Sequence, residues 1–128
     1  YNDNRDISLN DIGGGAVPKK QLETLTEPMY YTLIALLQAR CGMEITEFVL
    51  KLTRGRVHLV PGTLYTMLSK FENEDMIRET ESDGRKRFYL ITEKGKEMLM
   101  QEYRRLKTML QDGEVWIEKQ SDEKEAAS

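Results

Sequence analysis

Hydrophobic side chains recur at the three- and four-residue spacing of a helix in four stretches of the chain. The first stretch, residues 29–39, is apolar around most of its circumference, which predicts a helix nearly surrounded by protein. We expect this helix to begin at Thr26 as N-cap, with Pro28 in its first turn, and to end at Gly42. It would form the structural centre of the domain.

Two further helices are predicted before the middle of the chain. Residues 45–53 repeat apolar side chains at Ile45, Phe48, Val49 and Leu52, and Gly55 is expected to end that helix. The next helix opens at Pro61, whose fixed φ suits a first turn. Its expected buried side chains are Leu64, Leu68 and Phe71.

Alternating polar and apolar residues predict strands in two places. Residues 57–60 are expected to form a very short strand that pairs with the edge of a later hairpin. In that hairpin, one strand runs from Met76 to about Thr80 and its return occupies residues 88–91, with the turn at Asp83-Gly84. The pattern predicts a mainly α protein with a small β-hairpin, arranged as a winged helix-turn-helix over residues 19–91.

The last helix is expected at residues 92–111, with Thr92 as N-cap and Gly113 as the interruption. Its apolar residues follow alternating four- and three-residue steps, which is typical of a seam between two helices. They are Leu99, Tyr103, Leu106, Met109 and Leu110. We interpret this seam as a dimer interface; the alternative is packing against the protein's own winged domain.

The two ends of the chain are expected to differ from this folded part. Residues 1–18 lack periodicity and should be flexible, whereas residues 112–128 form an acidic, partly disordered tail. Trp116 lies in a short apolar cluster in this tail, where it could fold back to cap the hydrophobic seam. Met98, Leu106 and Trp116 could instead line a pocket for a small apolar or aromatic effector.

The distribution of charge along the chain matters more for nucleic-acid binding than the net charge does. The net charge is -3, with 32% charged and 39% hydrophobic residues, and binders of nucleic acids are usually basic. However, residues 112–128 hold six acidic residues against two lysines, so the rest of the chain is close to +1. A weakly charged body with cations gathered on one edge can still bind a duplex, with a steep salt dependence.

The candidate DNA-binding residues lie on the third helix and on the hairpin. Thr63, Thr66 and Lys70 share one exposed stripe of the helix, with Tyr65 and Ser69 beside it. Short hydroxyl side chains can approach base edges in the major groove, and Lys70 adds charge. Arg85, Lys86 and Arg87 follow the hairpin turn, where three neighbouring cations indicate an anionic partner such as phosphate.

Several other classes of protein are disfavoured. Cys41 is the single cysteine and His58 the single histidine, so no disulfide, cysteine-cluster zinc site or paired-histidine metal site is expected. We predict that Cys41 is a buried thiol and His58 a surface residue. No phosphate loop or nucleophile elbow is present, so we expect neither an enzyme nor a cofactor. Without an apolar run of about 20 residues or a secretion signal, a cytoplasmic location is expected.

From Glu27 to about Arg105 the chain resembles the PadR family of bacterial transcriptional regulators, of the short C-terminal type. Three motifs carry the resemblance, namely Thr26-Glu27-Pro28-Met29-Tyr30-Tyr31, Pro61-Gly62-Thr63-Leu64-Tyr65 and the wing Gly84 to Thr92. The resemblance implies a homodimeric repressor that occupies a palindromic operator in double-stranded DNA and leaves it when a small-molecule effector binds. The alternative function is a winged-helix module for protein interaction without sequence-specific DNA binding.

Three positions depart from the family pattern. Cys41-Gly42-Met43 stands where the family commonly has His-Gly-Tyr, and Leu106 stands where some members carry a tryptophan. Asp75 replaces the usual glycine after the recognition helix and tolerates a left-handed conformation less well, so we expect local strain or a differently shaped exit.

Overall fold

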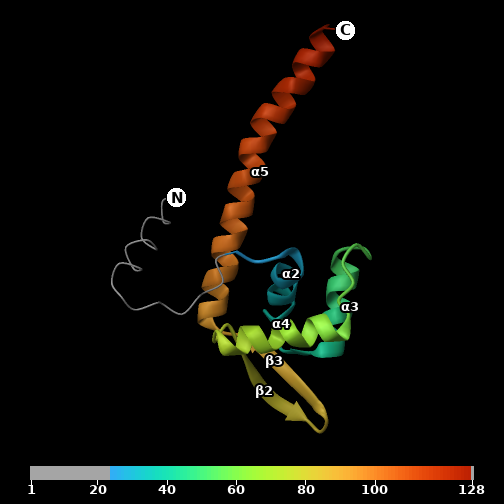
Figure 1. The fold of residues 1–128 in the computed structure, drawn as a ribbon, viewed down its shortest axis with the longest axis vertical. Helices are drawn as coiled ribbons and strands as arrows, with labels where there is room; N and C mark the ends of the chain where they lie inside the picture. The colour runs from blue at the N-terminus through green and yellow to red at the C-terminus, as the bar shows by residue number, and fades with distance from the viewer. Residues whose placement is uncertain (1–23, 128) are drawn as a thin grey trace, which may run out of the picture.

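The computed structural model describes residues 24–127, and the predicted flexible segment 1–18 lies outside this range. Figure 1 shows a small body of helices and strands from which one long helix extends far beyond every other element. The described elements are α2 (Glu27–Ala35), β1 (Arg40–Cys41), α3 (Gly42–Leu52), α4 (Pro61–Asn73), β2 (Ile77–Asp83), β3 (Lys86–Ile91) and α5 (Glu93–Ala127). The chain is therefore mainly α with a small antiparallel sheet. None of its described helices is both long enough and apolar enough to cross a membrane.

The start of α2 confirms the sequence prediction, but its end does not. Thr26 is the N-cap, and its hydroxyl accepts a hydrogen bond from the Met29 N–H at 3.4 Å. The helix stops at Ala35 rather than at Gly42, because the next residues leave helical geometry to reach the sheet. The Arg40 guanidinium donates to the Ala35 carbonyl, and the Ile91 N–H donates to Leu36.

Gly42 begins α3 instead of ending α2, so this helix starts three residues earlier than predicted. Glu44 accepts a hydrogen bond from the Cys41 N–H at 3.1 Å, which satisfies one donor at the helix start. At the other end the chain turns through Arg54 and Gly55, both at positive φ, and the Gly55 N–H donates to Leu50. Gly55 thus ends α3 as predicted.

The third strand of the sheet is not the predicted one. Arg40 and Cys41 form β1, which pairs antiparallel with β3, whereas residues 57–60 form no strand. The strand order is β1-β3-β2, so β1 pairs with the edge of β3 at which residues 57–60 were expected. Val57 and Leu59 are nevertheless buried, because the loop packs them into the core before α4 begins.

The predicted hairpin is confirmed, with longer strands. β2 and β3 extend to Asp83 and Lys86, which pair directly, and Gly84 takes a φ of 62° in the two-residue turn between them. An irregularity lies in β2 between Glu79 and Ser82, where the register shifts. The hairpin projects from the body as a narrow ribbon (Figure 1).

The last helix corrects two predictions. Thr92 is its N-cap as expected, since its hydroxyl accepts from the Gly95 N–H at 3.1 Å. However, α5 passes through Gly113 without a break and runs to Ala127, so residues 112–127 are helical rather than a partly disordered tail. A single glycine costs a helix only about 1 kcal/mol relative to alanine, and the flanking residues are good helix formers.

One hydrophobic core holds these elements together. Leu33, Ile45 and Phe71 are fully buried within it, and α2, α3 and α4 each contribute. The predicted buried residues of α4, Leu64, Leu68 and Phe71, are confirmed, and Cys41 is buried as expected. In contrast, Leu52 is exposed although the helical pattern placed it inside.

Candidate nucleic-acid interface

The outer face of α4 carries the residues predicted to read DNA. Thr63, Thr66 and Lys70 are all exposed, as are Tyr65 and Ser69 beside them. The Thr66 hydroxyl donates to the Gly62 carbonyl at 2.9 Å, one turn earlier in the same helix. The stripe is therefore accessible along about two turns, and its hydroxyl side chains are short enough for close approach to a base pair.

The start of α4 adds a positive electrostatic end to this stripe. Its N-cap is Val60, which has no side chain able to hydrogen-bond, and its first turn contains no acidic residue. The first N–H groups of any α-helix lack partners within the helix, and the helix dipole makes that end attractive to anions. Pro61 has no N–H, but Gly62 and Thr63 are exposed there, so a phosphate could approach their two N–H groups.

Tyr65 is held against α3 by a close approach that the sequence did not reveal. Its ring lies over Gly42, so that a Cβ added to Gly42 would lie 2.6 Å from the Tyr65 hydroxyl oxygen. The side chain is still 53% exposed. The lack of a Cβ on Gly42 thus leaves room for the hydroxyl end of Tyr65, while about half of the residue remains exposed for contact.

The three cations of the wing are not equivalent. Arg85, Lys86 and Arg87 are all exposed, but Arg87 donates to Glu79 on the neighbouring strand at 2.9 Å. That hydrogen bond raises the pKa of Arg87 further above its usual value, with Glu79 also contributing through its charge. Because the charge of Arg87 is partly balanced by Glu79 within the hairpin, Lys86 is the better candidate for a phosphate contact.

The wing and α4 are joined by a short, hydrogen-bonded connection. Asp75 follows α4 with a φ of 60°, and the Met76 N–H donates back to Phe71 at 2.9 Å. The Thr92 hydroxyl donates to the Asp75 carbonyl at 2.6 Å, and the Thr92 N–H donates to Met76. The predicted strain at Asp75 is thus present as a left-handed residue, and the start of α5 fixes the exit of α4.

A second cluster, which sequence reasoning missed, steadies the loop before α4. Arg56 donates to the Glu27 carboxylate and to the Tyr31 hydroxyl, the latter at 2.7 Å, and both lie on α2. The hydrogen bond that Arg56 donates to Glu27, and after it the one to Tyr31, raises the pKa of Arg56. The partners lie more than 20 residues apart in sequence, so no local pattern could have indicated the pairing.

The predicted dimer residues on α5 divide into two groups. Leu99 is only 6% exposed and belongs to the core of its own domain, so its assignment to a dimer interface is wrong. The other four lie further along α5 and are exposed; they are Tyr103, Leu106, Met109 and Leu110. The difference arises because α5 packs against α2 and β3, and Leu99 belongs to the core that these elements share, whereas the other four residues do not.

Glu102 marks the point where the body ends and α5 becomes free. It is 5% exposed, and both of its carboxylate oxygens accept hydrogen bonds from Arg105, at 2.5 and 3.1 Å. Burial raises the pKa of the neighbouring Tyr30 hydroxyl, and Tyr103, Tyr31 and Glu102 raise it further. Tyr30 therefore stays neutral at the contact between α2 and α5.

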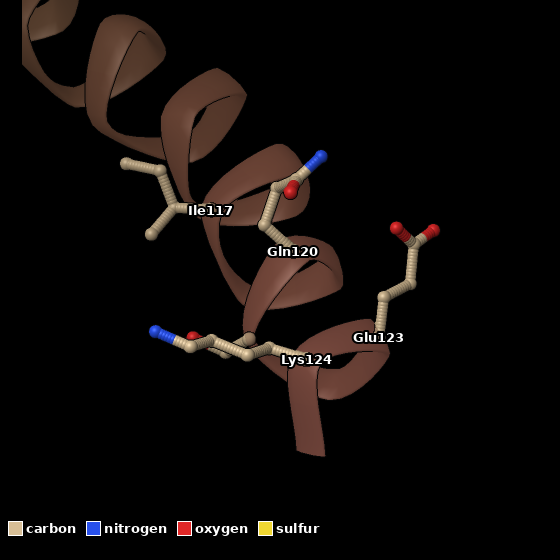
Figure 2. A pocket seen from close by; sticks show the side chains of 5 residues that line it. Ile117, Gln120, Glu123 and Lys124 are labelled. Atoms are coloured by element: carbon tan, nitrogen blue, oxygen red, sulfur yellow. The ribbon is translucent and has the colours of Figure 1, made fainter. Parts of the chain in front are cut away.

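The predicted effector pocket is not assembled within one chain. Met98 packs against the core, whereas Trp116 is 65% exposed, with the Lys119 ammonium 5.0 Å from its ring centroid. Because α5 is continuous, Trp116 cannot fold back, and a helix separates residues 98 and 116 by roughly 27 Å. The residues that line the hollow around Ile117 and Gln120 (Figure 2) all belong to α5 itself.

A helix-turn-helix followed by a cationic two-stranded wing defines a winged-helix protein of the DNA-binding type. The Transcriptional regulator PadR-like family matches residues 32–101, which is more than half of the chain. The chain therefore belongs to the PadR-like family of transcriptional regulators, a family of regulators rather than of enzymes. Among curated proteins, none matches the chain.

Solved structures of similar fold include several transcriptional regulators. RosR from H. salinarum has a TM-score of 0.56 at 22% identity, covering 84% of this chain and 100% of its own. A transcriptional regulator from Clostridium thermocellum has a TM-score of 0.58 at 18% identity, covering 66% and 82%. A PadR-like transcription factor from Bacteroides fragilis has a TM-score of 0.53 at 24% identity, covering 66% and 84%. These likenesses concern the fold.

Proposed function

We propose that this protein binds operator DNA as a homodimer, with α4 in the major groove and the wing on the flanking backbone. The observation that carries the proposal is the shared exposure of the α4 stripe and the wing cations on elements joined through Asp75 and Thr92. In this arrangement Thr63, Thr66 and Lys70 read bases. Tyr65 and Ser69 contact phosphates, and Arg85, Lys86 and Arg87 hold the backbone or a minor groove.

Two such units would read a palindrome. A two-fold dimer presents its recognition helices to two half-sites, which lie about 34 to 36 Å apart when they occupy successive major grooves. The exposed apolar residues of α5 beyond the body, including Leu106 and Leu110, support an interface between copies. From its family we propose a repressor role and release by a small apolar or aromatic effector bound between the subunits.

The proposal is tested by selecting bound fragments from random double-stranded DNA with the purified protein, at two salt concentrations. We expect enrichment of an inverted repeat, with weaker recovery at the higher salt because phosphate contacts release counterions. A Thr63→Val, Lys70→Ala variant should lose the enriched sequence while retaining its fold by circular dichroism. If the parent protein enriches no sequence, a protein-interaction module becomes the better explanation.

A further inference from the structure

The far half of α5 carries an apolar seam that the described part of the chain leaves uncovered. It continues the alternating three- and four-residue steps past residue 111. Its members are Tyr103, Leu106, Leu110, Gly113, Ile117 and Gln120. Before Tyr103 the same face is occupied by the protein's own core, where Leu99 is buried. The free seam therefore spans residues 103–120.

We infer that this seam binds the same seam of a second copy running in the opposite direction, as an antiparallel coiled coil with residues 111 and 112 at its two-fold axis. The inference rests on the proposed function, because it gives the proposed dimer a direction and a register. Full overlap of two 103–120 seams places Tyr103 beside the partner's Gln120 and Leu106 beside the partner's Ile117. Leu110 then faces the partner's Gly113.

The charges along α5 favour the antiparallel direction. Residues 93–111 contain five lysines and arginines against three glutamates, whereas residues 112–127 contain six acidic residues against two lysines. An antiparallel pair brings each basic half beside the partner's acidic half. A parallel pair would instead bring the two acidic halves together, and the resulting repulsion would disfavour it.

The antiparallel direction is also favoured by one pair of oppositely charged residues, Lys107 and Glu114. They lie seven residues apart and flank the seam on the same side of the helix. In the antiparallel register, Lys107 lies beside the partner's Glu114, and the two-fold axis repeats this contact. Within the described part of the chain, no salt bridge occupies either side chain.

The corresponding contact of a parallel pair is already blocked. A parallel coiled coil would pair Lys107 with the partner's Glu102, five residues earlier in the sequence. Glu102 is only 5% exposed, and Arg105 of its own chain donates to both of its carboxylate oxygens. The parallel direction would therefore leave Lys107 without an accessible acidic partner across the seam.

The shape of the seam agrees with its charge. A Cβ added to Gly113 would meet only Ile117 Cδ1, at 3.8 Å, so this point of the seam has open space. An antiparallel register fills that space with the partner's Leu110, whereas a parallel one places two glycines together and leaves a void. The open hollow beside Ile117 and Gln120 (Figure 2) would receive the partner's Tyr103 and Leu106.

Charge reversal, made in the whole 128-residue chain, tests the register. Lys107→Glu alone and Glu114→Lys alone should each raise the dimer dissociation constant roughly ten-fold or more, because each replaces two attractions by two repulsions. The variant carrying both changes should return to the parental value. Lys119→Glu, on the outer side of the helix, is the matched control and should leave the dissociation constant unchanged.

Disulfide formation tests the direction independently, with the buried Cys41 left in place. Leu106→Cys combined with Ile117→Cys should give a cross-linked dimer under mild oxidation, because a disulfide needs Cα atoms within about 7 Å. Ile117→Cys alone should not, since two copies of residue 117 would lie roughly 16 Å apart along the helix axis.

The outcomes separate this inference from the proposed function. Cross-linking by Ile117→Cys alone, or additive effects of the two charge reversals, would overturn the antiparallel direction while leaving a DNA-binding dimer intact. Dimers that are antiparallel but bind no DNA would support the inference and contradict the proposed function. A parent protein that sediments as a monomer with and without operator DNA would remove both.

Discussion

Asp75 holds a backbone conformation that its side chain does not favour. Its φ of 60° lies in the left-handed region, where a Cβ costs of order 1 kcal/mol that glycine does not incur. The position ends α4 and its carbonyl accepts from Thr92, so the conformation is imposed from both sides. The positive φ of Asp75 therefore lowers the stability of the fold directly beside α4, the helix proposed to read DNA.

Replacing Asp75 with Gly should therefore stabilise the domain by about 0.5 to 1 kcal/mol, the relief being partly offset by greater freedom of the unfolded chain. Urea denaturation followed by circular dichroism measures the change. Asp75→Ala removes the same charge but keeps a Cβ, so it should give no such gain. Equal stabilisation by both variants would contradict the account based on φ.

Lys86 is the wing cation best placed to contact phosphate, because Arg87 is engaged by Glu79. Lys86→Ala should weaken binding to operator and non-operator DNA alike and reduce the slope of log K against log salt by about one for each subunit bound. Lys119→Ala, on the far part of α5, serves as the control of equal charge change. An unchanged salt slope for Lys86→Ala would remove Lys86 from the interface.

At the scale of elements, the two glycines of α5 have opposite roles. Gly95 lies in the first turn, where an added Cβ would come within 2.1 Å of the Met76 carbonyl oxygen and 2.7 Å of Ile91 Cγ1. At Gly113, further along the helix, an added Cβ would meet only Ile117 Cδ1, at 3.8 Å, which is an ordinary contact. The first glycine is required for close packing of α5 against the sheet, whereas within its own chain the second meets no such close contact and lowers helix propensity.

The substitution Gly95→Ala should accordingly destabilise the protein by about 2 kcal/mol or more, because backbone atoms cannot move aside as a side chain can. Gly113→Ala should instead strengthen α5 by up to about 1 kcal/mol. Thermal melting of the two variants beside the parent compares them directly. A harmless Gly95→Ala would mean that α5 packs less closely against Met76 than described.

Local signals were sufficient to predict much of this architecture. Thr26 and Thr92 were identified as N-caps from their own side-chain chemistry, and α4 and the hairpin turn from residues that lie close together in sequence. β1 could not be found in this way, since Arg40 and Cys41 become a strand only by pairing with Tyr89 and Phe88. The continuation of α5 past Gly113 was missed because glycine was given more weight than its flanking helix formers.

The candidate site was predictable to the same extent. The exposed stripe of α4 follows from helical spacing, which requires no knowledge of distant residues. The contact of Tyr65 with Gly42 and the pairing of Arg87 with Glu79 arise from tertiary packing. Leu99 shows the same limit: its spacing matches the seam, but the seam alone does not say which turns the body already covers.

At the scale of the whole molecule, α5 divides into a part that belongs to the body and a part that does not. The exposed apolar residues beyond Glu102 include Leu106, Leu110 and Trp116, which a single copy leaves in water. Burying such side chains contributes about 25 cal/mol for each Å² removed from solvent. Self-association is the expected result.

Replacing Leu106 with Glu should thus yield monomers in analytical ultracentrifugation, because two charges would face an apolar seam across the two-fold axis. Its DNA affinity should fall with the loss of the second half-site. Leu52→Glu, on the exposed side of α3, introduces the same charge away from α5 and should remain dimeric. A dimeric Leu106→Glu variant would place the interface elsewhere.

The absence of a break in α5 has a mechanical consequence. The hydrogen bond from Thr92 to the Asp75 carbonyl connects the first turn of α5 to the end of α4, and α5 then continues without interruption to Ala127. A change of about 5° in the angle at which two such helices cross would swing an α4 helix by roughly 2 Å, since about 28 Å of helix lies between the crossing point and the first turn. A compound bound between the two α5 helices of the proposed dimer would thereby move both α4 helices out of their major grooves at the same time, because each α5 transmits the rotation along its length.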